Sequence, residues 1–481
     1  MNRIALVLIV IFFTPLGFAG EADALINEVT AVYGGDAVTN MTSIRSHDRF
    51  LTVAIGQGHS PARQETNQNH NIVHIDLKNK RFLTEFWGSS RGGSFQGATI
   101  FDGEKSTAVD YIQRQWSEAQ QTDFYLAAGG SLRTNDTFLV YELNRVRDQV
   151  KLLGDERFMG RPHTKLGMPF PGSPDLVLFI DNKTKLISRM LRVNPQAGNL
   201  DYIFSGHKTE AGVVSATQIT FLIAGAINFV STTHDVEVNV PMTDELLRVP
   251  TDFSAAGERN DGTVEVVNKI NDHVYHVGQG GGFSLFVRTS DGLVGAGGYA
   301  ALTNRLKQYQ AESGQHYPLT YQVITHHHTD HIGGVGEAVG LGAKLLTPAS
   351  NFTAVKENVT DRELKDSDFV AVDSRMTIGA GKDRVELYEV STAHSDAYLI
   401  VYVPTEKLIF IADHMGTPFK QGPAVSNLNL VTMYEALVDL GLDVKHIATA
   451  HGPRIFSFKD MASAASKFDP VTCADDREIC I

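Results

Sequence analysis

Histidine and aspartate gather in one short segment, HHHTDH, which runs from His326 to His331. Four imidazoles and a carboxylate this close together are unfavourable to fold unless a cation lies among them, and neutral imidazole and carboxylate are ligands that divalent metals prefer. Side chains two positions apart in an extended segment share a face, so His326 and His328 can hold one ion while His327 points elsewhere. Asp330 and His331, beyond the bend, can serve a second ion.

Three further candidate ligands, His394, Asp413 and His451, each come directly after a predicted strand. Those strands are predicted over 385–390, 408–412 and 446–450. Open α/β sheets place their binding sites at the carboxyl ends of strands. We therefore expect the three residues to join the HHHTDH segment in one metal site.

In this pattern the chain resembles the metallo-β-lactamase-fold superfamily, whose signature HxHxDH is matched by HHHTDH and whose later ligands come in the same order. The resemblance covers residues 263–465 and implies an αββα sandwich that binds two zinc ions (Zn²⁺). The ligands that it implies are His326, His328 and His394 for one ion, Asp330, His331 and His451 for the other, and Asp413 as the bridge between them.

The resemblance also implies a chemistry, namely hydrolysis of an ester, lactone, lactam or related bond in a small-molecule substrate. Two zinc ions can share a hydroxide, because they lower the pKa of the bound water toward neutrality. This hydroxide attacks the substrate while one ion polarises the bond that is cleaved. Asp330 is the implied catalytic residue, because it would orient the hydroxide. The ligand pattern does not choose among the substrates of the superfamily.

Two other functions stay open. One is an iron-dependent oxidoreductase of the same fold, similar to the persulfide dioxygenases, which share the histidine set; the diiron branch usually has a carboxylate where His328 stands. The other is a non-catalytic protein that binds lipid and metal, against which the complete ligand set argues.

Some residues depart from the family pattern or stay ambiguous. The segment 293–298 lacks the aspartate that relatives usually have before a glycine, and Ala412 precedes Asp413 where glycine is common. His414 could line the pocket and donate a proton, or it could be a hydrogen-bonded neighbour of the ligands. For His276 and Tyr398 we favour the second, structural interpretation.

The elements that must position these residues are predicted from hydrophobic periodicity. Strands over 264–267, 274–277 and 283–287 and helices over 302–309 and 430–440 make 263–465 an α/β region. The first half is predicted to be a mainly antiparallel β domain over 20–250, led by a helix over 22–33 and resembling lipoprotein-carrier-type β domains. In it, His70 and His74 are expected on a solvated strand face. The fold class is therefore α+β overall, with a boundary at 241–262.

The two ends of the chain predict export. Residues 1–19 are typical of a signal peptide, with Arg3, an apolar run over 4–13 and the small residues Gly17 and Ala19 before the cleavage site; an uncleaved anchor is the alternative. After cleavage we expect no stable membrane insertion, and a periplasmic or secreted protein. In the tail, 466–481, Cys473 and Cys480 are candidates for a disulfide.

The net charge of the chain limits the classes of molecule that it is expected to bind. The chain of 481 residues has 42 Lys and Arg against 55 Asp and Glu, a net charge of −13. Such an acidic chain repels phosphate backbones, and the sequence has no basic stripe, so we expect no nucleic-acid partner. The sequence does not determine the oligomeric state.

Overall fold

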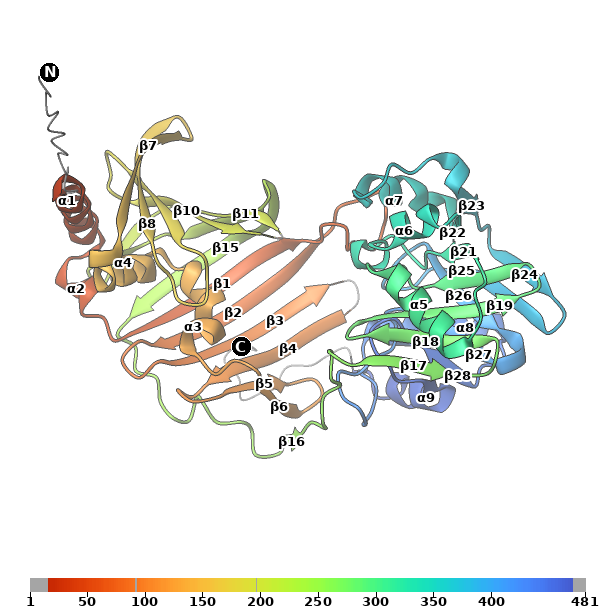
Figure 1. Cartoon of the computed structure of the whole chain (residues 1–481). Coiled ribbons are helices and arrows are strands. Elements are labelled where there is room, and N and C mark those ends of the chain that lie inside the picture. Colours follow the sequence, from red (N-terminus) through yellow and green to blue (C-terminus); the bar gives the residue numbers. More distant parts are fainter. Residues whose placement is uncertain (1–15, 91–92, 196, 470–481) are drawn as a thin grey trace, which may run out of the picture.

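A computed structural model describes residues 16–90, 93–195 and 197–469 of the chain. It shows two lobes, each built on its own β-sheet system (Figure 1). The predicted signal peptide lies largely outside the described residues, and so does the pair Cys473 and Cys480. Among the described residues, no helix combines the length and the apolar character needed to cross a bilayer.

The first lobe is organised around one fourteen-stranded sheet, in which every neighbouring pair is antiparallel except β16 with β6. In spatial order its strands are β16 (Ser254–Ala255), β6 (Gln115–Ala119), β5 (Ser106–Asp110), β4 (Gly93–Phe101), β3 (Arg81–Ser90), β2 (Thr66–Asp76), β1 (Ser43–Val53), β15 (Ala226–Val238), β14 (Gln218–Ile223), β11 (Gly198–Ser205), β10 (Ile187–Asn194), β9 (Leu176–Asp181), β8 (Arg161–Met168) and β7 (Lys151–Phe158). The strands β12 (Lys208–Glu210) and β13 (Val213–Ser215) form a separate pair.

The sheet is covered on both faces where β2 to β5 lie, so successive apolar side chains of a strand there belong to different cores. On β3, Phe82 belongs to the core under the helices and Leu83 to a second core on the opposite face. The helices are α1 (Leu16–Tyr33), α2 (Asp36–Thr39), α3 (Phe124–Arg133) and α4 (Asp136–Arg145). The opposite face is covered by the boundary segment 241–262, through residues such as Met242 and Phe253. The boundary segment is therefore packed on the sheet.

The antiparallel β domain with a leading helix is present as predicted, but two features differ from expectation. Helices α3 and α4 interrupt a region that was predicted as strands; Asp123 and Asn135 cap their first turns, which is the local signal for a helix start. His74 was expected on a solvated face, and that expectation is wrong. It is buried, because the second core covers that face of β2.

The second lobe contains two sheets packed face to face. The first consists of β17 (Glu265–Lys269), β18 (Val274–Gln279), β19 (Gly282–Thr289), β20 (Gly292–Ala296), β21 (Leu319–Val323), β22 (Lys344–Thr347) and β23 (Phe369–Ala371). The second consists of β24 (Arg375–Ala380), β25 (Asp383–Val390), β26 (Tyr398–Val403), β27 (Leu408–Phe410), β28 (His446–Ala448) and β29 (Phe456–Ser457).

Helices cover the outer face of each sheet. They are α5 (Leu302–Ser313), α6 (Val335–Gly340) and α7 (Phe352–Asn358) on one side, and α8 (Leu428–Leu440) and α9 (Phe458–Ala465) on the other. Short 3₁₀ turns lie at η1 (Arg147–Gln149), η2 (Thr329–His331), η3 (Ala349–Asn351), η4 (Asp366–Asp368) and η5 (Pro404–Glu406). The predicted αββα sandwich and the α+β class are thus confirmed.

Local sequence accounts for the elements that carry the site. Strand β26 is buried along its whole length, as its continuous apolar run requires between two packed layers. Helix α8 begins after Asn427, whose side chain accepts a hydrogen bond from the Leu430 N–H, and ends at Gly441 in the left-handed conformation. Strands β20, β21 and β22 run parallel, so the loops that follow them meet at one edge of the sandwich.

Candidate metal centre

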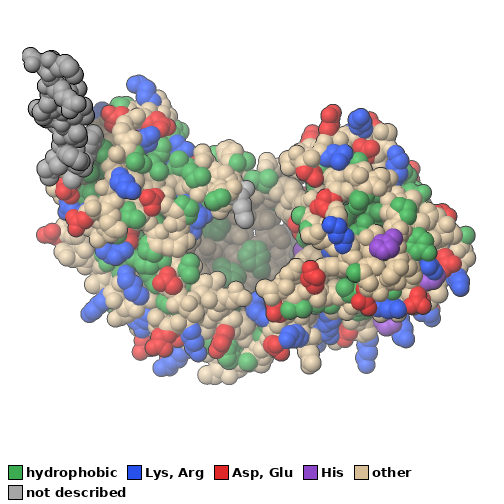
Figure 2. Space-filling model, in the orientation of Figure 1, with side chains coloured by type: hydrophobic (Ala, Val, Ile, Leu, Met, Phe, Trp, Pro, Cys, Tyr) green, Lys and Arg blue, Asp and Glu red, His purple; other side chains and the backbone are tan. Residues whose placement is uncertain are grey.

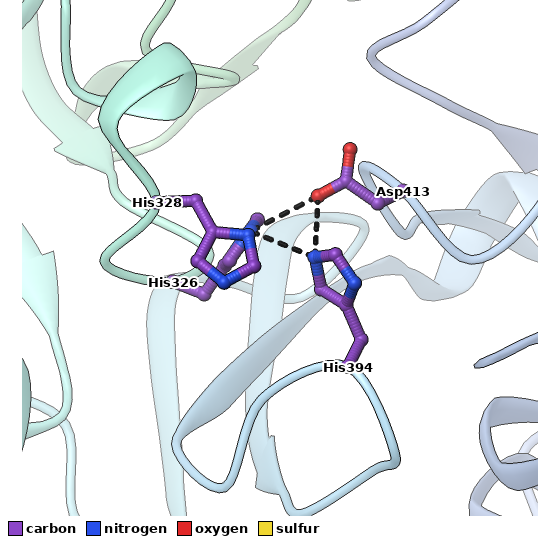
Figure 3. Close-up of side chains that lie close together, drawn as sticks. All are labelled: His326, His328, His394 and Asp413. Carbon is purple, nitrogen blue, oxygen red and sulfur yellow. Dashed lines mark hydrogen bonds and ion pairs between the residues drawn. The ribbon is translucent and has the colours of Figure 1, made fainter. Parts of the chain in front are cut away.

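The structure brings all seven predicted ligands together at this edge, in two groups that share Asp413. In each group every residue offers one ligand atom within 4.8 Å of the others. The first group, drawn in Figure 3, contains His326, His328, His394 and Asp413. The second contains Asp330, His331, Asp413 and His451.

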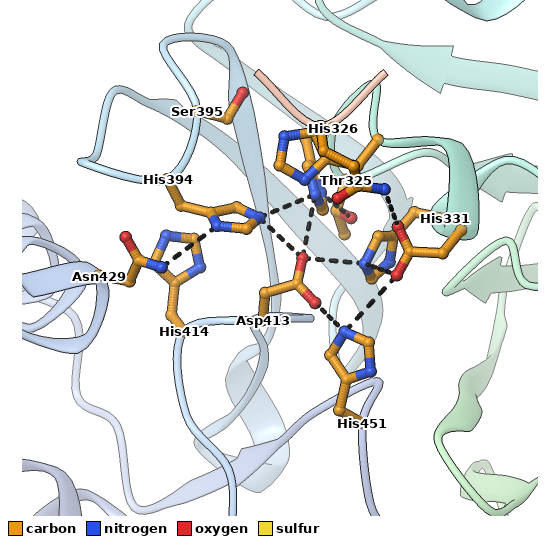
Figure 4. A network of polar contacts seen from close by, with 12 residues as sticks. Thr325, His326, His331, His394, Ser395, Asp413, His414, Asn429 and His451 are labelled. Carbon is orange, nitrogen blue, oxygen red and sulfur yellow. Dashed lines mark hydrogen bonds and ion pairs between the residues drawn. The ribbon is translucent and has the colours of Figure 1, made fainter. Parts of the chain in front are cut away.

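Asp413 occupies the middle of the cluster, with imidazoles on several sides (Figure 4). Its Oδ2 lies 3.0 Å from Nε2 of His326 and of His394 and 2.9 Å from Nε2 of His331, while His451 contacts Oδ1. Burial alone would raise the pKa of this carboxyl. The surrounding imidazoles, His331 first among them, instead hold it well below the usual range, so that Asp413 is an anion.

The donor set fits divalent metal ions. Nε2 of His326 and Nε2 of His394 face each other at 3.1 Å, and burial lowers the pKa of His326, which keeps that imidazole neutral. Two ligand nitrogens bound at about 2.0–2.1 Å to a tetrahedral ion lie roughly 3.3 Å apart, close to this spacing. Residues of both groups are therefore arranged as ligands of a cation.

The predicted ligands differ in solvent exposure, and the more exposed ones mark the side from which the site is accessible. His326 and His331 are almost completely buried, whereas the side chains of Asp330 and His451 are 38% and 42% exposed. A small molecule can therefore approach from the side of the second group. This side is also where the predicted catalytic residue, Asp330, lies.

Sequence reasoning missed Tyr299, which belongs to this site. Its hydroxyl lies 3.1 Å from Oδ2 of Asp330, 3.3 Å from Nε2 of His331 and 2.9 Å from Nε2 of His451. Burial, with the nearby carboxylates, raises the pKa of Tyr299, so the phenol keeps its proton. The available signal was its position, since Tyr299 follows β20 at the same edge as the ligands.

Tyr299 is held by its own backbone environment. The buried guanidinium of Arg305, on α5, donates hydrogen bonds to the carbonyl oxygens of Tyr299 at 2.6 Å and Ala300 at 2.8 Å. Gly298 allows a close approach, because a Cβ there would lie 2.3 Å from the carbonyl oxygen of His331. The segment 293–298, which lacks the aspartate expected before a glycine, is thus followed directly by a tyrosine that contacts the predicted ligands.

A loop of the first lobe also reaches the ligands. In the 54–65 loop, between β1 and β2, the side-chain amide of Gln57 donates to Oδ1 of Asp330 at 2.9 Å, and the carbonyl of Gly58 lies 2.9 Å from Nε2 of His328. A carbonyl only accepts, so Nε2 of His328 carries its proton and Nδ1 keeps a lone pair for a metal. The carbonyl of Gly56 accepts from the Thr329 N–H at 3.1 Å.

The remaining histidines of the region lie outside both groups. His327 is buried beside His328 and belongs to neither group of ligands. His414 is buried and within 2.8 Å of Thr392 Oγ1, which supports the role of a hydrogen-bonded neighbour. His276 contacts the Thr449 carbonyl at 2.8 Å, also a structural role.

Tyr398 likewise has a structural contact with the cluster. It is completely buried, and its ring stacks on His326 with the centroids 5.0 Å apart. This stacking fixes the plane of a ligand imidazole and leaves the tyrosine ring inside the sandwich. The structural interpretation favoured from sequence is consistent with this position.

Comparison with known proteins gives similarity of fold. No protein-family model and no curated protein matches the sequence. Among solved structures, a metallo-β-lactamase from Pontibacter korlensis matches at 19% identity, with 42% of this chain and 98% of that chain covered and a TM-score of 0.35. DIM-1 metallo-β-lactamase matches at 16% identity, with coverages of 42% and 95% and a TM-score of 0.34.

A third match is a rubredoxin:oxygen oxidoreductase from Desulfovibrio gigas, at 18% identity and a TM-score of 0.36, with 42% of this chain and 60% of that chain covered. All three are similarities of fold alone. The predicted resemblance to the metallo-β-lactamase fold is confirmed at that level, for 42% of the chain. The chemistry has to be argued from the residues of the cluster.

Proposed function

We propose that the protein is a metal-dependent hydrolase whose centre binds two zinc ions. The observation that carries this proposal is the arrangement of seven histidines and aspartates in two groups joined by Asp413. When bound, two such ions would polarise a substrate oxygen and make a water molecule nucleophilic near neutral pH. The first group would hold one ion, the second group the other, and Asp413 would bridge them.

The residues around the ligands have separate roles in this proposal. Asp330 would orient the attacking water, since one carboxylate oxygen is held by Gln57 while the other faces the interior of the site. Tyr299, which keeps its proton, would donate a hydrogen bond to the substrate oxygen that gains negative charge. Neither role requires a serine or cysteine nucleophile.

The proposed substrate is a small molecule, because the exposed side of the cluster admits a ligand beside Asp330 and His451. The bond to be cleaved in it is an ester, lactone, lactam or related bond. We further propose that the protein is exported to the periplasm or secreted, on the strength of residues 1–19. N-terminal sequencing of the mature protein tests export: a start near residue 20 is expected, and a start at Met1 would contradict it.

The proposal is tested with mature protein purified without added metal and then loaded with zinc. We expect two zinc ions per chain and hydrolysis of at least one member of a panel of esters, lactones, lactams and phosphodiesters. Asp330→Ala and His328→Ala should abolish that activity, while His316→Ala, at an exposed histidine outside the site, should not. One iron per chain together with oxygen uptake would overturn the hydrolase in favour of an oxidoreductase.

A further inference from the structure

The 54–65 loop runs from the ends of β1 and β2 in the first lobe to the second lobe (Figure 1). Figure 2 shows a hollow between the two lobes, so segments that cross from one to the other matter for how the lobes are held together. Residues 56–58 of this loop contact the HHHTDH segment. The next residue, His59, contacts a second segment of the metal centre, the loop 392–396 that carries the ligand His394.

His59 binds both ends of the loop 392–396. Its Nε2 lies 2.8 Å from the carbonyl oxygen of Thr392, and its own carbonyl accepts a hydrogen bond from the N–H of Asp396 at 3.0 Å. Because a carbonyl only accepts, Nε2 of His59 carries a proton and is the donor of the first bond. The imidazole is buried, so water does not compete for this bond. His394 is therefore held through residues on both sides of it.

The loop 392–396 passes this constraint on to its ligand, because hydrogen bonds within the loop connect its residues. The N–H of Thr392 donates to the carbonyl of Ser395 at 3.0 Å, and Oγ1 of Thr392 accepts from the N–H of His394 at 3.2 Å. Nε2 of His394 in turn lies 3.0 Å from Oδ2 of Asp413. A displacement of Thr392 would therefore move a ligand of the first group relative to the bridging carboxylate.

The residue before His59 holds another ligand of the same group. The carbonyl of Gly58 lies 2.9 Å from Nε2 of His328, and the ring centroids of His328 and His394 are 4.5 Å apart. The N–H of His59 donates to Oε2 of Glu65 at 3.0 Å, which ties this part of the loop to the residue before β2. Two adjacent residues of the first lobe thus hold two ligands that come from different segments of the second lobe.

We propose that His59 is a positioning residue of the metal centre, and that through it metal binding and docking of the 54–65 loop stabilise each other. This coupling rests on the metal centre of the proposed function and not on the reaction that it catalyses. Such a coupling is reciprocal: the factor by which the docked loop strengthens metal binding is the factor by which bound metal favours the docked loop. Couplings of this kind typically amount to about 5- to 150-fold.

Docking of the loop can be measured by proteolysis, because Arg63 in the loop is exposed and trypsin cleaves after arginine. The full chain is stripped of metal with chelator and then loaded separately with zinc, cobalt or iron(II). Each ion that binds should slow cleavage after Arg63 by about 5- to 150-fold, because cleavage requires the undocked loop. Cleavage after Lys183, which is exposed in the turn between β9 and β10 of the same lobe, should not change.

Variants separate the positioning role from a general effect on folding. His59→Leu removes the hydrogen-bond donor, and His59→Gln keeps one. His163→Leu is the matched control, because His163 on β8 is also buried, with Nδ1 2.9 Å from the carbonyl oxygen of Arg161. Only His59→Leu should bind the ion more weakly, by about 5- to 150-fold, and lose the protection of Arg63 by metal. Circular dichroism and the Tm identify any variant that fails to fold, and the comparison of wild-type protein with and without metal needs no variant.

The outcomes distinguish this inference from the proposed function. A bound ion that leaves cleavage after Arg63 unchanged would overturn the inference even if the protein is a hydrolase, and so would wild-type affinity or protection in His59→Leu. Protection that is lost in His59→Leu and kept in His59→Gln would support it, even if no panel substrate is hydrolysed or the native ion is iron. Failure of all three ions to bind would overturn both the inference and the metal centre on which it rests.

Discussion

Substitution of Gly56 by alanine should weaken metal binding, although this residue belongs to the first lobe and touches no metal ligand through a side chain. Gly56 has a φ of +60°, and a Cβ on it would lie 2.4 Å from Cγ2 of Thr329. Relief of that overlap moves either the 54–65 loop or Thr329, which precedes Asp330 directly. Both movements disturb the hydrogen bonds that the loop makes with Asp330 and His328.

The magnitude follows from the buried hydrogen bond between His328 and the carbonyl of Gly58. Leaving a buried donor or acceptor without its partner costs about 1–3 kcal/mol. Since about 1.4 kcal/mol is a tenfold change in affinity, zinc should bind roughly 5- to 150-fold more weakly to the variant. The bond from Gln57 to Asp330 adds less, because Gln57 is exposed and water competes for it.

The assay is competition for zinc with a chromophoric chelator, and the matched control is Gly154→Ala. Gly154, on β7, also has a positive φ, +79°, but a Cβ there meets nothing within 4 Å. Both variants carry the same kind of backbone strain, of about 1–2 kcal/mol in folding stability, and only Gly56→Ala disturbs the ligands. Equal zinc affinities in the two variants would refute the view that the 54–65 loop positions the metal ligands.

Three other predictions concern single side chains. Asp413→Asn should lose bound metal, and with it the fall in Tm that chelator causes in the wild type, because ions bound to the folded state stabilise it; two retained ions per chain would contradict the bridging role. Tyr299→Phe should keep both ions and lower kcat by about 100- to 1,000-fold, the typical effect of removing a hydrogen-bond donor to the oxygen that gains negative charge, and an unchanged kcat would exclude a role for its hydroxyl. Burial lowers the pKa of His276 to about 4, whereas in the unfolded chain its pKa is about 6.5. The unfolded state therefore binds the extra proton first, so stability from the neutral His276 is fully present above pH ~6.5 and is lost as the pH falls toward 4. The free energy of unfolding of metal-free protein, measured from pH 7 to 4.5, should fall less in His276→Gln than in the wild type, and equal slopes would contradict the assignment.

The ligand set could be predicted from the sequence because its information is local. His326 and His328 share a face through a spacing of two, and His394, Asp413 and His451 each stand directly after an apolar strand. Residues that directly follow such strands meet at one edge of the sandwich, whatever the length or conformation of the loops that connect the strands. Tyr299 also follows a strand, β20, but tyrosine is not among the usual metal ligands, so its position alone did not predict that it belongs to the site.

The contribution of the first lobe could not be predicted in this way. Gln57 and Asp330 are 273 positions apart, and nothing in the sequence around Gln57 marks it as part of a site. Helices α3 and α4 were not predicted for another reason, since each has only 10 residues and lies in a region whose apolar pattern otherwise predicts strands.

The sequence by itself determined the types of the metal ligands, the edge at which they meet and the layered α+β architecture, because residue spacing and apolar periodicity are properties of short segments. Only the tertiary structure decided that the β1–β2 loop holds two of those ligands and that Tyr299 lies among them. The physical reason is that these features depend on how segments far apart in the sequence pack against each other, and such packing leaves no periodic pattern in either segment.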